Sequence, residues 1–114
     1  MANRSLPLNP SHPVGGMVFF DRKELNLLFG LYGRMVSAGH WRDYAIDGLK
    51  DAAVFSVFRR ASEIPLYRIE KRPALAHRQG AWLVTAHGGL VLKRGHDLAQ
   101  VLRLFDRERF ALVD

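Results

Sequence analysis

The side chains best suited to chemistry in this chain are its arginines and lysines. Residues 51–80 carry six basic and three acidic side chains, which account for half of the net charge of +6. Guanidinium and ammonium groups bind phosphate and carboxylate oxygens through charge-assisted hydrogen bonds. This pattern favours nucleic acid or an acidic protein as the partner. The residues expected to form the contact surface are Arg59, Arg60, Arg68, Lys71, Arg72, Arg78, Lys93 and Arg94.

Patterns for catalysis and metal binding do not occur in the sequence. The chain has no cysteine, which excludes thiol nucleophiles, thiolate zinc sites and disulfides. No serine stands in a local frame that would activate it as a nucleophile. The five histidines have no metal-ligand spacing, so a metal would need distant residues such as His87 and His96. We therefore expect no catalytic residue, no metal and no cofactor.

One helix start carries the best small-anion pattern. Gly95 precedes a predicted helix and has Lys93, Arg94 and His96 beside it. Free backbone N–H groups and basic side chains would converge there. Asp97, as the residue that caps this helix, would compete for the same N–H groups.

Two amphipathic helices are expected to support these surfaces. Asp21 and Glu24 form a capping-box pair, and Gly39 is a natural stop for the first helix. Its predicted core-facing stripe is Leu25, Leu28, Tyr32, Met35 and Val36. Gly30 and Gly33 within it indicate either close packing against another backbone or a weakened helix. The stripe of the second helix is Leu98, Val101, Leu102 and Phe105.

Short segments with strand patterns fill the remainder of the chain. They are residues 17–20, 41–47, 52–58, 66–72, 82–86 and 90–93. In residues 66–72, Tyr67 and Ile69 face inward, whereas Arg68, Glu70 and Arg72 face outward. The Gly88-Gly89 pair predicts a hairpin turn between the last two strands. Residues 110–113 would add an edge strand or pack on the core.

This element order predicts an α+β fold. We expect an antiparallel sheet of five or six strands with two helices packed on one face. Residues 1–15, with prolines at 7, 10 and 13, are expected to be a flexible N-terminal arm, and residues 16–114 a single domain. No apolar run of about 18 residues exists, so we expect a cytoplasmic protein outside the membrane.

The main alternative to a basic contact surface is a homodimeric protein-interaction module. The second face of the sheet would then carry exposed apolar residues, with Val54, Phe58 and Trp82 as candidates. The basic residues would serve only solubility. A deep pocket that holds His87, His96 or Asp43 would instead favour an enzyme.

Three strings of the sequence resemble a known family. They are WRDYAID, PLYRIEKRP and LKRGHDLAQVLRLFD, within a resemblance that covers residues 16–114. The family consists of small alphaproteobacterial domains of unknown function. It has no assigned activity or catalytic residues, so the resemblance implies a free-standing bacterial cytoplasmic protein and transfers no site residue.

Overall fold

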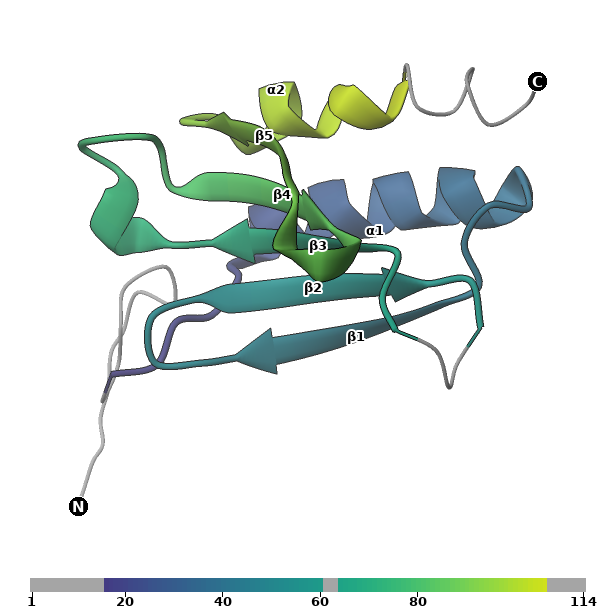
Figure 1. The fold of residues 1–114 in the computed structure, drawn as a ribbon, viewed down its shortest axis with the longest axis horizontal. Helices are drawn as coiled ribbons and strands as arrows, with labels where there is room; N and C mark the ends of the chain where they lie inside the picture. Colours follow the sequence, from purple (N-terminus) through teal and green to yellow (C-terminus); the bar gives the residue numbers. More distant parts are fainter. Residues whose placement is uncertain (1–15, 61–63, 107–114) are drawn as a thin grey trace.

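The structure is a computed structural model that describes residues 16–60 and 64–106. Five strands form an antiparallel sheet in which each strand pairs with its neighbours in sequence, in the order β1-β2-β3-β4-β5 (Figure 1). The elements are α1 (Arg22–Ser37), β1 (Asp43–Gly48), β2 (Ala53–Phe58), β3 (Tyr67–Lys71), the 3-10 helix η2 (Pro73–Leu75), β4 (Trp82–Ala86), the 3-10 helix η3 (His87–Gly89), β5 (Val91–Gly95) and α2 (Leu98–Leu102). The predicted α+β fold is confirmed.

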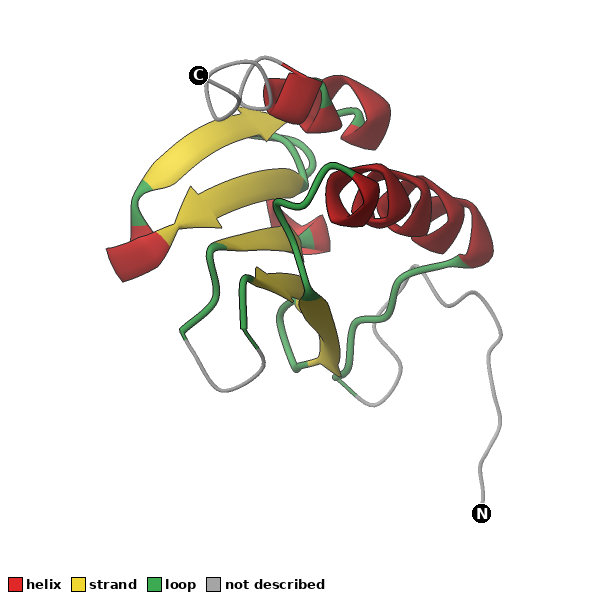
Figure 2. Cartoon of the chain, turned by 90° about the vertical axis from the view of Figure 1, so that its right-hand side faces the viewer, coloured by secondary structure: helices red, strands yellow, loops and turns green. Residues whose placement is uncertain are grey.

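Both helices lie on one face of the sheet, as predicted (Figure 2). Phe55, Ile69 and Val84 face each other across β2, β3 and β4, and all three are fully buried. The helices contribute Leu28, Leu31, Met35, Leu98, Val101 and Leu102 to the same core. Residues of the opposite strand parity lie on a second face without a described helix. Val54, Glu70 and Leu83 on that face are also buried.

The start of α1 follows the predicted capping box. The Asp21 carboxylate accepts from the Glu24 N–H at 2.9 Å, and the Glu24 carboxylate accepts from the Asp21 N–H at 2.8 Å. These two bonds satisfy donors that have no partner within the helix, an arrangement worth about 1 kcal/mol. The same Glu24 carboxylate also pairs with Lys71 on β3, so the cap fixes the helix to the sheet.

One local prediction is wrong, and one of two alternatives for the glycines of α1 is excluded. Residues 17–20 do not form a strand: the Val18 N–H donates to the Leu49 carbonyl at 2.8 Å, and the Phe19 carbonyl accepts from Lys71 instead of a neighbouring strand. No second backbone approaches Gly30 or Gly33, since only the Arg34 side chain comes within 4 Å of a Cβ built on the former and nothing does for the latter. The predictions for residues 1–15 and 110–113 lie outside the described residues.

Candidate functional site

Three arginines mark the face of the sheet opposite the helices. Arg68 on β3 lies opposite Thr85, and Arg94 on β5 lies opposite Leu83, each with the strand parity opposite to that of the core. Arg72 follows β3 with the parity of Arg68. We call Arg68, Arg72 and Arg94 the sheet-face strip. It is the part of the predicted contact surface that one face brings together.

The three guanidinium groups differ in their partners. The Arg72 Nε donates to the Glu70 carboxylate at 2.8 Å, and the side chains are 39% and 7% exposed. Glu70 therefore orients Arg72 and offsets its charge. Arg68 and Arg94 are exposed, and within residues 16–60 and 64–106 neither has an ion pair or hydrogen bond through its side chain. The strip thus presents two cations that are free to bind an anion.

A hollow of about 340 Å³ adjoins the strip. Arg68, Glu70, Arg72, Thr85 and His87 supply its polar lining, with Ile64, Pro65 and the η3 turn at its border. No hydrogen bond joins the Thr85 hydroxyl to a base among the described residues. The described part of the chain also contains no group of three His, Asp or Glu residues that could hold a metal.

Lys71 does not belong to this surface. Its side chain is 5% exposed, and its Nζ donates to the Glu24 carboxylate at 2.7 Å and to the Phe19 carbonyl at 2.9 Å. Residue 71 has the strand parity of Ile69, which places it on the helix side. The expectation that Lys71 contributes to the contact surface is corrected: it joins the sheet to α1.

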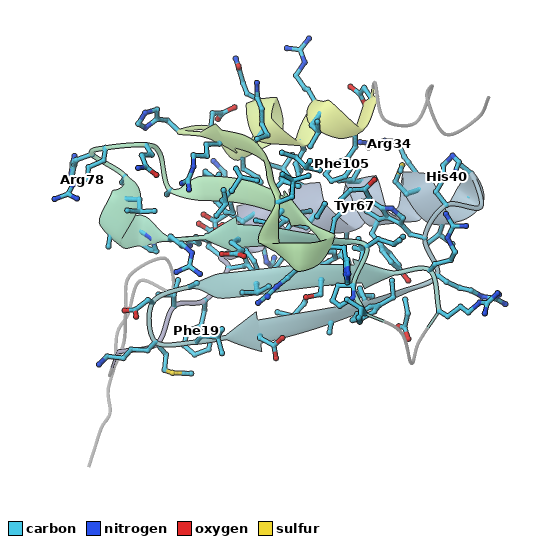
Figure 3. All side chains as sticks on the ribbon, in the orientation of Figure 1. Phe19, Arg34, His40, Tyr67, Arg78 and Phe105 are labelled. Carbon is cyan, nitrogen blue, oxygen red and sulfur yellow. The ribbon has the colours of Figure 1, made fainter. Side chains whose placement is uncertain are left out.

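The other predicted basic residues lie elsewhere. Arg59 and Arg60 follow β2 and line a second hollow with His40. Arg78 lies at the opposite end of the molecule from His40 (Figure 3). Lys93 lines a further hollow with Gln100 and Arg103 beside α2. The eight residues therefore do not form one continuous surface.

Aromatic rings are concentrated on the helix side of the sheet. Trp82 stacks on Phe20 with ring centroids 6.2 Å apart, and Tyr44 stacks on Phe55 at 5.5 Å. Trp82 lies opposite Lys71 in the register, so its expected place on the second face is corrected. Phe58, half-buried at the end of β2, has the strand parity of the sheet-face strip, whereas the stacked pairs lie on the helix side.

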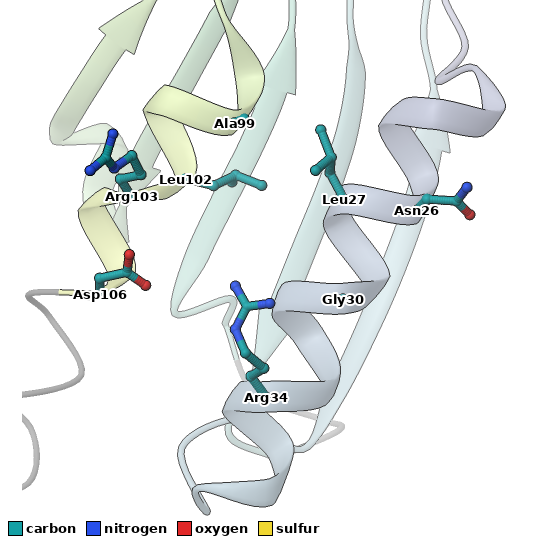
Figure 4. Close-up of a pocket in the computed structure, with 8 residues that line it drawn as sticks. All are labelled: Asn26, Leu27, Gly30, Arg34, Ala99, Leu102, Arg103 and Asp106. Atoms are coloured by element: carbon teal, nitrogen blue, oxygen red, sulfur yellow. The ribbon is translucent and has the colours of Figure 1, made fainter.

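Two further features are a hollow between the helices and the start of α2. A hollow of about 220 Å³ separates α1 from α2, where Leu27 and Leu102 point toward one another and Arg34 extends beside Gly30 (Figure 4). At the start of α2, the Asp97 carboxylate accepts from the Gln100 N–H at 3.0 Å. That cap occupies a donor which the predicted small-anion site would need.

Fold and surface define an α+β domain with basic residues on the sheet face opposite its helices. The chain belongs to the family described as "Protein of unknown function (DUF2794)", which matches residues 18–102. The resemblance to small domains of unknown function is thereby confirmed, and the alphaproteobacterial distribution stays a prediction. No curated protein and no solved structure gives a significant match. None of the helices described here has the length and apolar character needed to cross a membrane.

Proposed function

We propose that this domain is a non-enzymatic binding module whose sheet-face strip contacts the phosphates of nucleic acid. The supporting observation is the pair of exposed guanidinium groups of Arg68 and Arg94 on one sheet face, which have no partner among the described residues, beside an Arg72 oriented by Glu70. A cytoplasmic location agrees with this function and stays a prediction.

The spacing of the strip suits a row of phosphates. Strand geometry puts the backbone positions of Arg68 and Arg94 about 12 Å apart and those of Arg68 and Arg72 about 13 Å apart. Nucleic acid rises about 3.4 Å per nucleotide along the duplex axis, so each of these distances equals the axial rise of three to four nucleotides. Arginine side chains are long enough to adjust to the exact positions.

The chemistry of the strip favours phosphates over bases. Guanidinium groups bind phosphate oxygens in two-pronged geometry. Base recognition in single strands uses exposed aromatic rings, and the stacked rings of Trp82 and Tyr44 lie on the other side of the sheet. We therefore expect binding that depends weakly on sequence and steeply on salt.

The experiment measures fluorescence anisotropy of labelled duplex DNA, single-stranded DNA and RNA over a range of salt concentrations. The test variant is Arg68→Gln with Arg94→Gln, which leaves the Arg72–Glu70 pair intact. The control is Arg22→Gln with Lys23→Gln, which removes the same charge from exposed positions on α1.

We expect the strip variant to bind at least about tenfold more weakly, with a salt slope lower by about 1.8, because two phosphate contacts are lost. The control should change the affinity by much less. Absence of binding at low salt, or equal losses in both variants, would refute the proposal. Binding of an acidic protein with no binding of nucleic acid would refute it in favour of the other predicted partner.

A second candidate function is supported by apolar exposure at the β1 edge. Phe29, Tyr44, Ile46 and Leu49 are each between 37% and 45% exposed, and β1 is an edge strand. A homodimer would cover these side chains. This apolar surface lies on the helix side. On the second sheet face, where the sequence indicated it, Val54 is buried. Sedimentation velocity would show a dimer that Ile46→Asp dissociates, whereas a monomeric wild-type protein would exclude this function.

A further inference from the structure

A second basic hollow lies where β1 begins and β2 ends. The Arg42 N–H donates to the Phe58 carbonyl at 2.8 Å, so Arg42 and Arg59 emerge from adjacent strand ends. The hollow has a volume of about 420 Å³. We call it the strand-end hollow; its described lining comprises Val36, Gly39, His40, Trp41, Arg42, Arg59 and Arg60.

The charged residues in the described lining are three arginines, and none of the described residues there is acidic. Arg60 already has an interaction partner, which leaves Arg42 and Arg59. Arg42 and Arg59 are exposed, and neither side chain has an ion pair or hydrogen bond among the described residues. Like charges on facing strand positions destabilise a sheet. An anion bound between them would convert this repulsion into attraction.

Two buried nitrogen atoms of the same lining also need partners. They are the Trp41 Nε1 and the His40 Nε2, which are the two buried side-chain atoms without a hydrogen bond in the part of the chain described here. Trp41 is only 3% exposed, and its indole N–H can act solely as a donor. A buried donor left unpaired costs about 1–3 kcal/mol, so such a group calls for an explanation.

We propose that the strand-end hollow binds a phosphate monoester. Arg42 and Arg59 supply the positive charge. The Trp41 Nε1–H and the His40 Nε2–H are buried in the free protein, so the lining must open slightly before they donate hydrogen bonds to the phosphate oxygens. The volume lies within the range of small-ligand pockets and exceeds that of a bare phosphate, so the phosphate carries an organic group. This ligand comes either from a free nucleotide or from the 5′ end of a nucleic-acid strand.

The chain offers an internal probe for this site. It contains two tryptophans, and Trp82 serves as the reference because it stacks on Phe20 away from the hollow. The experiment follows both indole N–H signals by proton–nitrogen NMR. The Trp41 signal is assigned by its contact with the Phe105 ring, whose centroid lies 5.2 Å away, so no tryptophan variant has to fold.

The titrants are inorganic phosphate, a nucleoside 5′-monophosphate, and a short oligonucleotide with or without a 5′-phosphate, with sodium chloride at equal ionic strength as the blank. We expect saturable shifts of the Trp41 signal alone, at lower concentrations of ester than of inorganic phosphate. Arg42→Gln with Arg59→Gln should weaken binding at least about tenfold, because two charged contacts are lost. The variant of Arg68 and Arg94 should leave it unchanged.

Each outcome decides the proposal. Saturation by the monophosphate supports a free nucleotide, and saturation only by the 5′-phosphorylated oligonucleotide supports a strand end. Equal shifts with sodium chloride, shifts of both tryptophans, or affinity retained in the variant of Arg42 and Arg59 would overturn it. The proposal stands independently of the sheet-face strip, since the two variant pairs remove different arginines.

Discussion

Replacing Lys71 with methionine tests whether this lysine is a structural link between the sheet and α1. Methionine keeps most of the apolar stem and removes the ammonium group. The change abolishes the contacts of Nζ with the Glu24 carboxylate at 2.7 Å and with the Phe19 carbonyl at 2.9 Å. It also leaves the carboxylate, which is 17% exposed, without its cation.

The expected loss follows from these contacts. Removing one partner of a buried ion pair costs about 3–5 kcal/mol, because the other charge stays behind in a poorly solvated place. The Glu24 carboxylate retains some exposure and its hydrogen bond from the Asp21 N–H. We therefore expect a loss at the lower end, about 3 kcal/mol. Domains of this size have total stabilities of about 5–15 kcal/mol, so the effect is easily measured.

The assay is urea denaturation followed by circular dichroism, for Lys71→Met, Glu24→Gln and the double variant. The double variant should be less destabilised than the sum of the two single changes, by about 1.5 kcal/mol, since it removes both charges. Lys23→Met, an exposed position on α1, is the control. A loss below about 1 kcal/mol for Lys71→Met, with no coupling to Glu24, would refute the structural role.

Two further predictions concern backbone space and alkaline pH. A Cβ at Gly80 (φ +97°) would clash with the Gly95 carbonyl group, so Gly80→Ala should cost more than about 2 kcal/mol in urea denaturation. Gly88→Ala (φ +77°, with nothing described within 4 Å) should cost about 1 kcal/mol, and equal costs for the two variants would contradict this prediction. Burial, followed by the charges of Asp43 and Tyr44, raises the pKa of Tyr32 above its ordinary value of 10.0. The folded state thus holds this proton more tightly than the unfolded state, and its contribution to stability is complete below pH 10 and lost as the pH rises through the folded-state pKa. Tyr32→Phe should therefore lose less stability than the wild type between about pH 9 and pH 11, and an equal loss would show that Tyr32 has no part in it.

The elements that local chemistry specifies were predictable from the sequence. Asp21 and Glu24 form the capping box that their spacing indicated, and Gly88 and Gly89 adopt the positive φ of the predicted turn. Residues 17–20 were misassigned because an apolar run of four has no periodicity that separates a strand from a buried connection. Here the Phe19 carbonyl has a lysine as its partner instead of a neighbouring strand.

The candidate site was harder to predict because it depends on pairing between distant residues. Strand parity alone places Lys71 on the same side of the sheet as Ile69. The prediction nevertheless included Lys71 in the contact surface, because it weighted the concentration of charge in residues 51–80 over strand parity. Arg42 and Trp41 were not singled out for the strand-end hollow, which needs the register of β1 against β2 to bring them to Arg59. The unpaired Trp41 Nε1 leaves no signal in a sequence.

The order of the strands has a consequence for how the chain reaches its native state. Since every strand pairs with the next one along the chain, each pairing step closes only a short loop and has a small entropic cost. The sheet can therefore grow hairpin by hairpin as the chain leaves the ribosome, from β1 toward β5. Its assembly does not have to wait for the C-terminal segment, and we expect rapid folding for a protein rich in β-structure.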